Sequence, residues 1–508
     1  MKKSLVLGLL VMMFAKSFAT VKPNSLFSDN MVLQRGVAVP IWGTANDSEK
    51  VTVEFNGQKV TTIAKDGKWM LKLKPLKAGG PFKMTISGEN TITIQNILVG
   101  EVWVCSGQSN MERQLGLRNG QKPIVNWIAE AASANYPAIR QYFVPHNYFI
   151  KTNLADTMFT DVNSKWVVCD TASVKEFSAV GFFFARELYK KYQVPVGMLF
   201  SSVGGTPAEN WTTRAALEAN PELKVLAEQY DKARMEYPDA MAKYKKDLPA
   251  IIAKYAADTL VALAAHKPFP PKPAPPRNPI GGSGGLYNAM INPLIPYAIK
   301  GVIWYQGESN GGRGKQYQTL FPTMITDWRQ HWNEGDFPFL YVQIAPFKSA
   351  DPMIREAQLL TLNKVPNVAM VVTTDCGDST DIHPNHKQPV GERLALAARA
   401  LAYKEKIEYS GPLFENYVVR GTDVELSFTH TGKGLVTKDG GELTGFFICG
   451  PDKKFVPATA VISGNKVIVS NPAISFPLAV RYGFTSVPNG NLFNQEGLPA
   501  SPFRTDVE

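Results

Sequence analysis

At residues 98–111 the sequence reads LVGEVWVCSGQSNM, an apolar run that ends in a turn of small and polar residues. Strands of this unalternating kind are buried on both faces, as in a parallel sheet that helices cover on either side. Four more runs of the same character follow, at 196–202, 301–305, 339–344 and 368–373. Helical patterns such as 182–192 and 390–401 lie between them, so this part of the chain predicts an α/β fold with a parallel central sheet.

The segments on both sides of this region have a period of two instead. From Val51 to Phe55, for example, apolar and polar residues alternate ahead of an Asn-Gly turn. Alternation broken by such turns is typical of antiparallel strands with one buried face. The pattern predicts a small β domain at 20–96 and a second one at 406–508, with the α/β domain at 97–405.

An insertion interrupts the α/β region at about 214–280. Its first part, 214–265, is rich in Ala, Lys and Glu and predicts helix. The proline-rich run 267–276 cannot continue a helix, so we expect it to be extended. The glycine-rich stretch 281–285 then returns the chain to the sheet.

The first residues have the features of an export signal. Lys2 and Lys3 precede an apolar run, and small residues stand at the two positions that a signal peptidase reads before residue 20. The run is shorter than the ~20 apolar residues that a membrane span requires. Residues 1–19 therefore predict a cleavable signal peptide, no membrane attachment after cleavage, and a periplasmic or secreted protein.

Composition excludes several classes of protein. The chain has 508 residues, of which 44% are hydrophobic, and its net charge is +10, so it is not a disordered chain. The positive charges are spread out, without the basic stripe that would indicate nucleic-acid binding. Its four cysteines have no zinc-binding spacing. Cys105 and Cys376 lie in apolar runs and are expected to be buried free thiols.

Polar residues follow four of the predicted strands. In an open parallel sheet, ligands bind beyond the carboxyl ends of the strands. The segments found there are Gly107-Gln108-Ser109-Asn110-Met111, Gly204-Gly205-Thr206, Gln306-Gly307-Glu308-Ser309-Asn310 and Asp381-Ile382-His383-Pro384. A serine, glycines, amides and an Asp/His pair are thus expected to meet at one edge of the sheet.

These residue types are the ones that ester hydrolysis by acyl transfer requires. A serine hydroxyl becomes a good nucleophile when a histidine accepts its proton, and a carboxylate orients that histidine. Backbone N–H groups at glycine turns can stabilise the oxyanion of the tetrahedral intermediate. We predict Ser109 as the nucleophile and His383 as the base.

The motifs resemble those of the sialate O-acetylesterases, carbohydrate esterases of the SGNH hydrolase superfamily. The resemblance includes the four segments above and extends to Leu26–Gln34, similar to the family's N-terminal β domain, and to Leu286-Tyr287-Asn288-Ala289-Met290-Ile291, similar to its active-site loop. It implies a three-layer α/β domain with a parallel sheet, flanked by small all-β domains. The implied reaction is removal of O-acetyl groups from carbohydrates without a metal or organic cofactor.

The superfamily's serine, glycine, asparagine and histidine fall on Ser109, Gly205, Asn310 and His383, with Gly204 as the alternative glycine. The resemblance thus implies an oxyanion hole built from the N–H groups of Ser109 and Gly205 together with Asn310. Asn310 stands one residue later than the usual spacing, so the supporting amides Gln108 and Gln306 are alternatives.

The carboxylate that orients His383 is less clearly defined. The superfamily commonly has an aspartate three residues before the histidine, where this chain has Thr380. We favour Asp381, which lies two residues before, and keep Asp378 and Glu308 as alternatives. A divalent ion is an alternative ligand for the group Asp375, Asp378, Asp381, His383 and His386. No calcium-loop or zinc-helix spacing is present, so we expect no metal.

Residues near the nucleophile are candidates for substrate binding. Arg113 occupies a position where relatives often have tryptophan, and it or Arg118 could pair with the carboxylate of an acidic sugar, because a guanidinium matches a carboxylate. Trp211 is a candidate for stacking on a sugar ring. Tyr287 and Asn288 belong to the segment that resembles the family's active-site loop.

The sequence therefore predicts an exported carbohydrate O-acetylesterase, with sialate as the favoured substrate. An acetylesterase for acetylxylan or other plant glycans has the same chemistry and is the first alternative. The second is a non-catalytic carbohydrate-binding protein in which the two β domains bind the ligand. The intact serine and histidine argue against this last reading.

Overall fold

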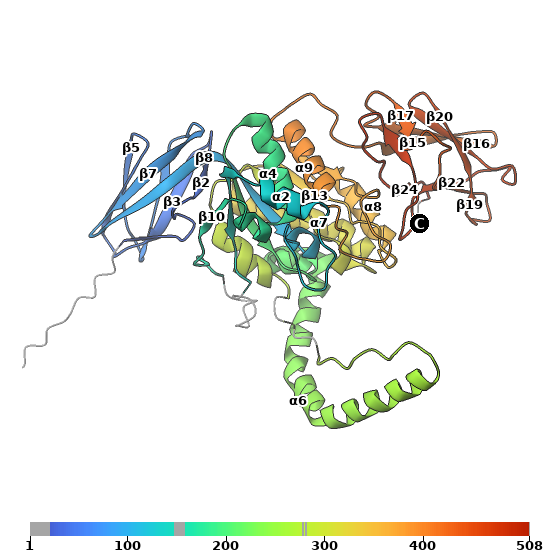
Figure 1. Cartoon of the computed structure of the whole chain (residues 1–508), viewed down its shortest axis with the longest axis horizontal. Helices are drawn as coiled ribbons and strands as arrows, with labels where there is room; N and C mark the ends of the chain where they lie inside the picture. The colour runs from blue at the N-terminus through green and yellow to red at the C-terminus, as the bar shows by residue number, and fades with distance from the viewer. Residues whose placement is uncertain (1–20, 147–157, 277–278, 280–281, 507–508) are drawn as a thin grey trace, which may run out of the picture.

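The computed structural model describes residues 21–146, 158–276, 279 and 282–506. The predicted signal peptide lies outside these residues. Figure 1 shows three parts in a row, with N-terminal strands at one end, a central α/β region, and C-terminal strands at the other end. A long helix, α6, extends from the central region.

The largest sheet among the described residues has eleven strands. Its main path runs through β10 (Trp166–Cys169), β9 (Tyr136–Phe143), β11 (Val196–Ser202), β8 (Thr91–Gly107), β12 (Gly301–Tyr305), β13 (Phe339–Val342) and β14 (Val368–Val371). Neighbours from β9 to β14 are parallel, as predicted, whereas β10 is antiparallel to β9. The sheet is therefore mixed rather than purely parallel.

Successive side chains of the central strands enter two different cores, because they point to opposite faces of the sheet. In β8, Trp103 and Cys105 lie in the core that α4 and α9 cover. Val102 and Val104 lie in the core on the opposite face, which α7 and α8 cover. Burial on both faces explains why these strands are continuously apolar in sequence.

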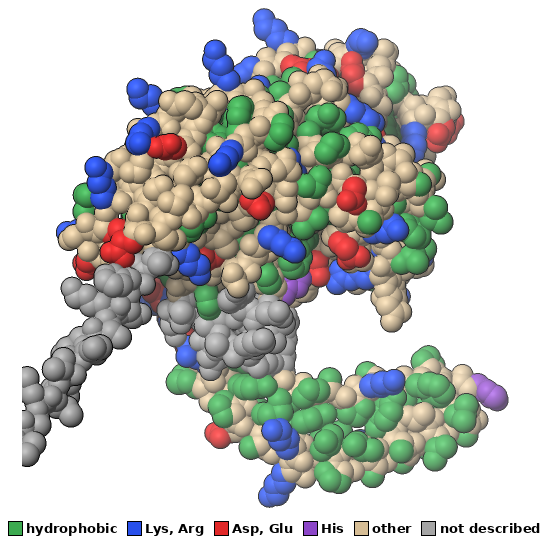
Figure 2. Space-filling view, turned by 60° about the vertical axis from the view of Figure 1, so that its left-hand side comes forward, with side chains coloured by type: hydrophobic (Ala, Val, Ile, Leu, Met, Phe, Trp, Pro, Cys, Tyr) green, Lys and Arg blue, Asp and Glu red, His purple; other side chains and the backbone are tan. Residues whose placement is uncertain are grey.

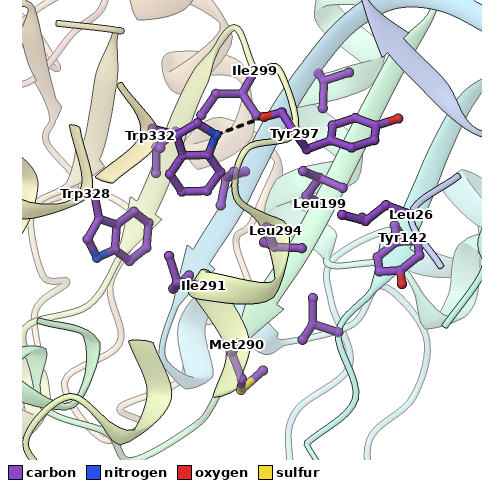
Figure 3. Close-up of a cluster of buried hydrophobic side chains, with 14 of the residues drawn as sticks. Leu26, Tyr142, Leu199, Met290, Ile291, Leu294, Tyr297, Ile299, Trp328 and Trp332 are labelled. Carbon is purple, nitrogen blue, oxygen red and sulfur yellow. Dashed lines mark hydrogen bonds between the residues drawn. The ribbon is translucent and has the colours of Figure 1, made fainter. Parts of the chain in front are cut away.

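The core beneath α7 continues into the N-terminal part of the chain. Figure 3 shows Trp328 and Trp332 of this helix, together with Leu199 of β11 and Leu26. The indole N–H of Trp332 donates a hydrogen bond to the carbonyl of Tyr297 at 2.9 Å. Full burial of each large apolar side chain is worth about 1.5–3 kcal/mol, so this shared core binds the N-terminal strands to the sheet.

The helices begin at residues suited to cap them. Asp351 accepts a hydrogen bond from the N–H of Met353 at the start of α8, and Pro352 occupies its first position. Ser178 accepts one from the N–H of Gly181 and caps α4. The helices around the sheet are α1 (Ser109–Glu112), α2 (Trp127–Ser133), α4 (Ala179–Tyr192), α7 (Gly314–Trp332), α8 (Pro352–Thr361) and α9 (Gln388–Leu401).

Strand β8 belongs to both the N-terminal part and the central sheet. It runs for 17 residues, and the predicted domain boundary at 96/97 falls inside it. Its first half pairs with β7 (Gly79–Ser87) and β2 (Val32–Gln34). The other N-terminal strands are β1 (Lys22–Pro23), β3 (Val39–Thr44), β4 (Lys50–Phe55), β5 (Gln58–Ile63) and β6 (Lys68–Leu73).

The C-terminal strands form three small sheets around their own core, which includes Val424, Ile448 and Phe503. The first sheet contains β15 (Leu413–Arg420), β16 (Asp423–Thr429), β21 (Lys466–Ser470) and β20 (Thr459–Ser463); the second, β17 (Leu435–Thr437) and β23 (Leu492–Asn494); the third, β19 (Val456–Pro457), β18 (Phe446–Cys449), β22 (Ala479–Tyr482) and β24 (Phe503–Arg504). The buried guanidinium of Arg355 in α8 joins this part to the α/β region by donating to the carbonyls of Thr485 and Ser486.

The predicted helical insertion consists of α5 (Arg214–Ala219) and α6 (Pro221–Ala264). The buried residues of α6 are Leu223, Leu226, Ala227 and Tyr230, all in its first turns. Beyond them the helix leaves the body, and the proline-rich segment returns beside it (Figure 1). Figure 2 shows many apolar side chains on this arm, and Ile252 and Leu260 are among the exposed ones.

Short 3₁₀ and π segments connect several of these elements: η2 (Ser173–Glu176), η3 (Ala208–Trp211), η4 (Tyr287–Ile291), η5 (Asn292–Leu294) and η6 (Glu308–Asn310). Cys105 and Cys376 are buried free thiols, as predicted. Within the described part of the chain, no helix has both the length and the apolar character that crossing a membrane demands.

Candidate active site

The turn after β8 places the predicted nucleophile. Gly107 ends the strand with φ +137°, and a Cβ at this position would lie 2.2 Å from the carbonyl oxygen of Tyr305. Only glycine fits such a close approach of two backbones. The chain then turns through Gln108 and begins α1 at Ser109, beyond the carboxyl end of β8.

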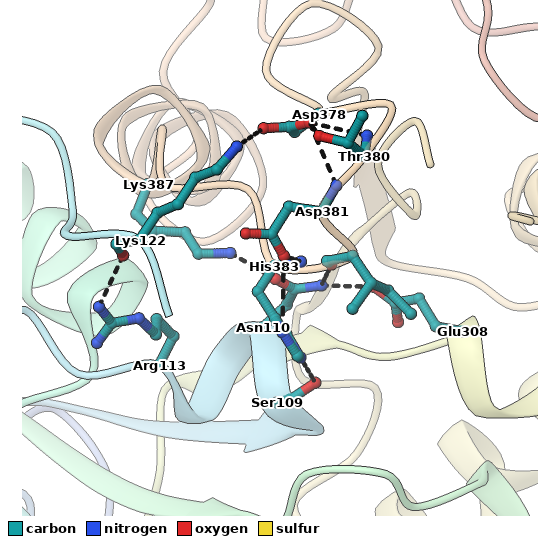
Figure 4. A network of polar contacts seen from close by, with 11 residues as sticks. Ser109, Asn110, Arg113, Lys122, Glu308, Asp378, Thr380, Asp381, His383 and Lys387 are labelled. Carbon is teal, nitrogen blue, oxygen red and sulfur yellow. Dashed lines mark hydrogen bonds and ion pairs between the residues drawn. The ribbon is translucent and has the colours of Figure 1, made fainter. Parts of the chain in front are cut away.

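The structure brings Ser109 and His383 together. Nε2 of His383 lies 2.9 Å from Oγ of Ser109, although 274 positions separate the two residues in the sequence (Figure 4). His383 stands on the loop between β14 and α9, and two strands, β12 and β13, lie between β14 and β8 in the sheet order. The distance is within hydrogen-bonding range for a histidine that accepts a hydroxyl proton.

A pocket of about 560 Å³ opens over this pair. It is lined by Gln108, Ser109, Glu112, Arg118, Gln121, His146, Val203, Gly204, Gly205, Glu308, Ser309, Ile382 and His383. A larger pocket, of about 950 Å³, lies next to Arg35 and Trp332 and contains none of the predicted site residues. The polar groups required for acyl transfer thus lie at the smaller one.

Asp381 is close to the imidazole of His383 without a short contact to it. Its Oδ1 accepts a hydrogen bond from the backbone N–H of His383 at 2.8 Å. The same oxygen lies 3.9 Å from Nδ1 of the imidazole. At this separation the carboxylate attracts an imidazolium by charge but does not form a direct hydrogen bond with it.

The two alternative carboxylates have other partners. Asp378 forms an ion pair with Lys122 and accepts a hydrogen bond from the hydroxyl of Thr380 at 2.7 Å. These contacts lower the pKa of Asp378, with the hydrogen bond from Lys122 as the main cause. Glu308 is half-buried and accepts a hydrogen bond from the amide of Asn110 at 2.6 Å.

The glycine turn after β11 forms another wall of the pocket. The N–H of Gly204 donates to Oε2 of Glu112 at 2.6 Å, so this group is already engaged. Gly205 follows with φ +73°, a conformation that glycine adopts without steric cost. Both glycines line the pocket beside Ser109, and Gly205 stays the predicted oxyanion donor, with Gly204 as the alternative.

The side chain of Asn310 has hydrogen-bond partners inside the protein and does not line the pocket. Its Nδ2 donates to Glu209 at 2.9 Å, and its Oδ1 accepts from the N–H of Ala208 at 3.0 Å and from Nε2 of Gln306 at 2.7 Å. Both halves of the amide are thus used inside the protein, away from the pocket-lining residues. The contribution of Asn310 to the oxyanion hole therefore stays a prediction.

The alternative amides differ in position. Gln306 is fully buried, where its Oε1 accepts from the hydroxyl of Tyr317 at 2.9 Å, and it lies outside the pocket. Gln108 does line the pocket, and its Oε1 is 3.3 Å from the N–H of Ser309. Only Gln108 of the two can contact a bound substrate.

Four predicted substrate-binding residues do not line the pocket. The guanidinium of Arg113 is 1% exposed and donates to the carbonyls of Gln114, Gly116 and Lys122, so it stabilises its own loop. Trp211 is fully buried, and its indole N–H donates to the hydroxyl of Thr206 at 3.0 Å. Trp211 therefore cannot stack on a sugar ring.

The other two belong to the predicted active-site loop. Tyr287 is fully buried, and its ring packs edge-on against His331 at 5.3 Å. Asn288 is also buried, and its carbonyl accepts a hydrogen bond from the N–H of Phe159. Neither residue lines the pocket over Ser109 and His383.

The pocket also contains residues that sequence reasoning did not place in it. Glu112 joins Arg118, at 3.0 Å, to the N–H of Gly204. Nε2 of His146 lies 2.6 Å from the carbonyl of Ser202. The motif GQSNM was a signal for Glu112, which directly follows it, whereas nothing in the sequence around His146 indicated the site.

Charges around the site affect the pKa of the histidine. Burial lowers the pKa of His383, and the positive charges of Lys387, Arg118 and Arg113 lower it further. Asp381 acts in the opposite direction. The balance keeps the imidazole neutral and able to accept a proton at a pH below its ordinary pKa. Among the described residues, no group of three or more His, Cys, Asp or Glu side chains is arranged to hold a metal ion.

Comparison with known proteins agrees with this chemistry. Residues 278–400 match a family described as carbohydrate esterase, sialic acid-specific acetylesterase. The sialate O-acetylesterase of Rattus norvegicus is 30% identical over 95% of this chain and 94% of its own length. The enzyme of Homo sapiens is 31% identical over 94% of this chain and 91% of its own.

A solved structure is similar over the same extent. The crystal structure of a carbohydrate acetylesterase from Xanthomonas citri is 34% identical and superposes with a TM-score of 0.79. The match covers 96% of this chain and 100% of that one. The similarity therefore includes the flanking β parts as well as the α/β region.

Proposed function

The chain belongs to the sialate O-acetylesterase family and is a carbohydrate O-acetylesterase, and we propose that it deacetylates O-acetylated sialic acid through an acetyl-enzyme on Ser109. The family assignment decides against a non-catalytic carbohydrate-binding protein. The observation that carries the proposal is the 2.9 Å contact between Oγ of Ser109 and Nε2 of His383 at the pocket.

In the first half of the proposed reaction, Nε2 of His383 accepts the proton of Ser109 while Oγ attacks the acetyl carbonyl carbon. The carbonyl oxygen becomes an oxyanion, which the N–H groups of Ser109 and Gly205 stabilise. The sugar hydroxyl then leaves with the proton from His383, and the acetyl group stays on Ser109. Asp381 stabilises the transient imidazolium by its charge.

In the second half, water replaces the sugar. His383 accepts a proton from water, which attacks the acetyl carbonyl carbon. Collapse of the second tetrahedral intermediate returns the proton to Oγ of Ser109 and releases acetate. No group other than these side chains, two backbone N–H groups and water takes part in the scheme.

Arg118 supports an acidic sugar as the substrate. Its side chain is 33% exposed at the pocket, and Glu112 fixes one edge of its guanidinium. A guanidinium held in this way can offer its other N–H groups to a carboxylate, a group that sialic acid has and xylose lacks. This residue distinguishes the proposal from the plant-glycan alternative.

The fold also supports an SGNH-type arrangement of the site. Ser109, Gly205 and His383 occupy the serine, glycine and histidine positions of that pattern and line one pocket. The asparagine position differs, because Asn310 bonds inside the protein. We therefore propose an oxyanion hole that depends on backbone N–H groups, with Gln108 as the nearest side-chain amide.

We further propose that the protein is exported to the periplasm or beyond the cell. This rests on residues 1–19, whose pattern is that of a cleavable signal. Amino-terminal sequencing of the protein purified from its native cells should give a chain that starts near residue 20. A chain that retains Met1 contradicts the proposal.

The catalytic proposal is tested with the Ser109→Ala variant. Its kcat on a chromogenic acetate should fall by about 10⁴-fold or more, while its circular dichroism and melting temperature stay those of the wild type. Product analysis on acetylated sialosides and acetylated xylo-oligosaccharides, side by side, tests the substrate. Near-normal turnover by the variant rejects Ser109, and a preference for xylo-oligosaccharides rejects sialate.

A further inference from the structure

Asn110, the residue after the proposed nucleophile, connects the serine turn to the histidine loop. Its Nδ2 donates to the carbonyl of Ile382, the residue before His383, at 3.1 Å. It also donates to Oε1 of Glu308 at 2.6 Å. Its Oδ1 accepts a hydrogen bond from Nζ of Lys387 at 2.6 Å (Figure 4). One amide therefore contacts three segments that are far apart in the sequence.

The two side chains at the centre of this network, Asn110 and Lys387, are buried, and Glu308 is half-buried at the edge of the pocket. Asn110 is fully buried and Lys387 is 1% exposed. Oε2 of Glu308 is buried and has no hydrogen-bond partner in the part of the chain that the structure describes. Burying an ammonium and a carboxyl group costs stability unless both are well paired. An arrangement that costs stability in this way is expected where the position of the loop matters for function.

We infer that Asn110 and Lys387 are positioning residues of the esterase reaction, which hold His383 at hydrogen-bonding distance from Ser109 and set the charge that its imidazole experiences. The inference rests on the proposed function, since it assigns roles around the same serine and histidine. Neither residue touches the substrate or the reacting atoms, and both act through His383.

The geometric part follows from the backbone of the histidine loop. The carbonyl of Ile382 is one peptide unit from His383, so its contact with Asn110 fixes the position of the imidazole relative to Oγ of Ser109. Loss of the amide leaves this carbonyl and Glu308 without their donor. A displacement of about 1 Å at a reacting group can reduce the rate by on the order of 10²-fold.

The electrostatic part follows from the position of the Lys387 ammonium. Its Nζ donates to Asn110, the neighbour of Ser109, and lies 5.2 Å from the ring centre of Tyr305. Its charge opposes protonation of the His383 imidazole. Arg118 and Arg113 act on His383 in the same sense, and Asp381 opposes them. Removal of the Lys387 charge should therefore raise the pKa of His383.

Lys387 is itself influenced by its neighbours. Burial lowers its pKa to about 7, Glu308 and Asp381 raise it, Arg113 lowers it and Cys376 raises it. Burial also raises the pKa of Glu308. Below pH 7 the ammonium is mostly charged, and this is the range in which His383 titrates. Its effect on the imidazole should therefore appear in the acid limb of the pH profile.

The geometric part is tested with Asn110→Ala, compared with Asn385→Ala. Asn385 is a matched control, because it is on the same loop and donates to the carbonyl of Pro123 at 2.8 Å, away from Ser109. On 4-nitrophenyl acetate we expect Asn110→Ala to lower kcat by about 10- to 100-fold with little change in KM, and Asn385→Ala to stay within about threefold of the wild type. An equal loss in both variants, or a folded Asn110→Ala with wild-type kcat, overturns the positioning role.

The electrostatic part is tested with Lys387→Gln, which keeps a donor toward Asn110 but removes the charge. Lys122→Gln is the control, because Lys122 is a solvent-exposed cation that pairs with Asp378 on the same loop. The acid limb of kcat/KM should move to higher pH by about half a unit or more in Lys387→Gln, and should not move in Lys122→Gln. If the acid limb of Lys387→Gln stays at the wild-type pH, the electrostatic part is wrong. This test does not depend on Asn110→Ala, so it holds even if that variant fails to fold.

Different results would contradict the proposed catalytic function and the positioning roles of Asn110 and Lys387. If Ser109→Ala keeps its turnover, the proposed catalytic serine is wrong and the inference falls with it. If Ser109→Ala is inactive while Asn110→Ala and Lys387→Gln are folded and behave like the wild type, only the positioning roles are wrong.

Discussion

The carboxylate of Asp381 accepts a hydrogen bond from the backbone N–H of His383 at 2.8 Å and lies 3.9 Å from Nδ1 of the same histidine. One oxygen thus shapes the loop and faces the imidazole. In this protein the carboxylate acts on the imidazole mainly by its charge, whereas in other serine esterases it holds the ring through a short hydrogen bond.

This geometry predicts a graded effect of replacing the nearby carboxylates. Asp381→Ala should lower kcat on a chromogenic acetate by about 10²-fold or more, because the imidazolium loses its closest negative charge and the loop loses a backbone contact. Asp378→Ala should stay within about threefold of the wild type, since its carboxylate pairs with Lys122. Steady-state kinetics of both variants check this, and a larger loss in Asp378→Ala would assign the orienting role to that residue instead.

Arg118 should matter for acidic substrates only. In Arg118→Ala we expect KM for acetylated sialic acid to rise by about tenfold or more, because a charge-assisted contact is lost. KM for a neutral acetylated xylo-oligosaccharide should change little. The comparison of kcat/KM on the two substrates is the measurement. An equal loss on both excludes a carboxylate-specific role.

Arg113→Ala serves as a contrast. The buried guanidinium of Arg113 binds only backbone carbonyls, so its substitution should reduce stability without changing the substrate preference.

The pH dependence of the wild type follows from the environment of His383. Its pKa is lowered by burial and by nearby cations, and the base must be neutral to accept the serine proton. Activity should therefore persist as the pH falls to the ordinary histidine value of about 6.5, and decline only below it. A profile of kcat/KM between pH 4 and 8 measures this, and an acid limb centred above pH 7 contradicts the predicted direction.

The junction between the α/β region and the C-terminal strands depends on Arg355. Its buried guanidinium donates to four backbone carbonyls, two of them in the C-terminal part. Arg355→Ala should lower the free energy of unfolding by about 3 kcal/mol or more, because it leaves buried acceptors unpaired. Arg420→Ala, at a side chain that is 66% exposed, should change it by less than about 0.5 kcal/mol. Urea denaturation of both variants tests the difference, and equal stability of the two contradicts it.

Much of the fold could be predicted because its signals are local. The buried strands are continuous apolar runs, and their order along the chain places their carboxyl ends at one edge. The antiparallel strand β10 could not be predicted in this way, since its pairing with β9 depends on contacts that a short apolar run does not specify. The continuity of β8 across residue 96 was hidden for the same reason, because its sequence changes from alternating to apolar within one strand.

Site residues could be predicted where a motif fixes the path of the backbone. They were harder to predict where the direction of the side chain decides whether the residue reaches the pocket. Ser109 and His383 lie on turns whose glycine and proline neighbours set the chain path. Asn310 and Trp211 lie in equally informative motifs, but contacts with distant segments, Glu209 for Asn310 and the ring of Trp304 for Trp211, accompany the burial of their side chains. Asn110 was visible beside the nucleophile, yet its role depends on Lys387, whose burial no pattern in the sequence indicated.

Strand β8 has a consequence for how this enzyme can be shortened. A cut at residue 97 would remove the first six residues of an unbroken 17-residue strand, along with the parallel pairing of Leu33 with Val99. The rest of the strand ends at the nucleophile turn, so loss of its anchored beginning would loosen the element that holds the reactive hydroxyl. The smallest autonomous catalyst that can be excised from this chain must therefore keep its amino-terminal module.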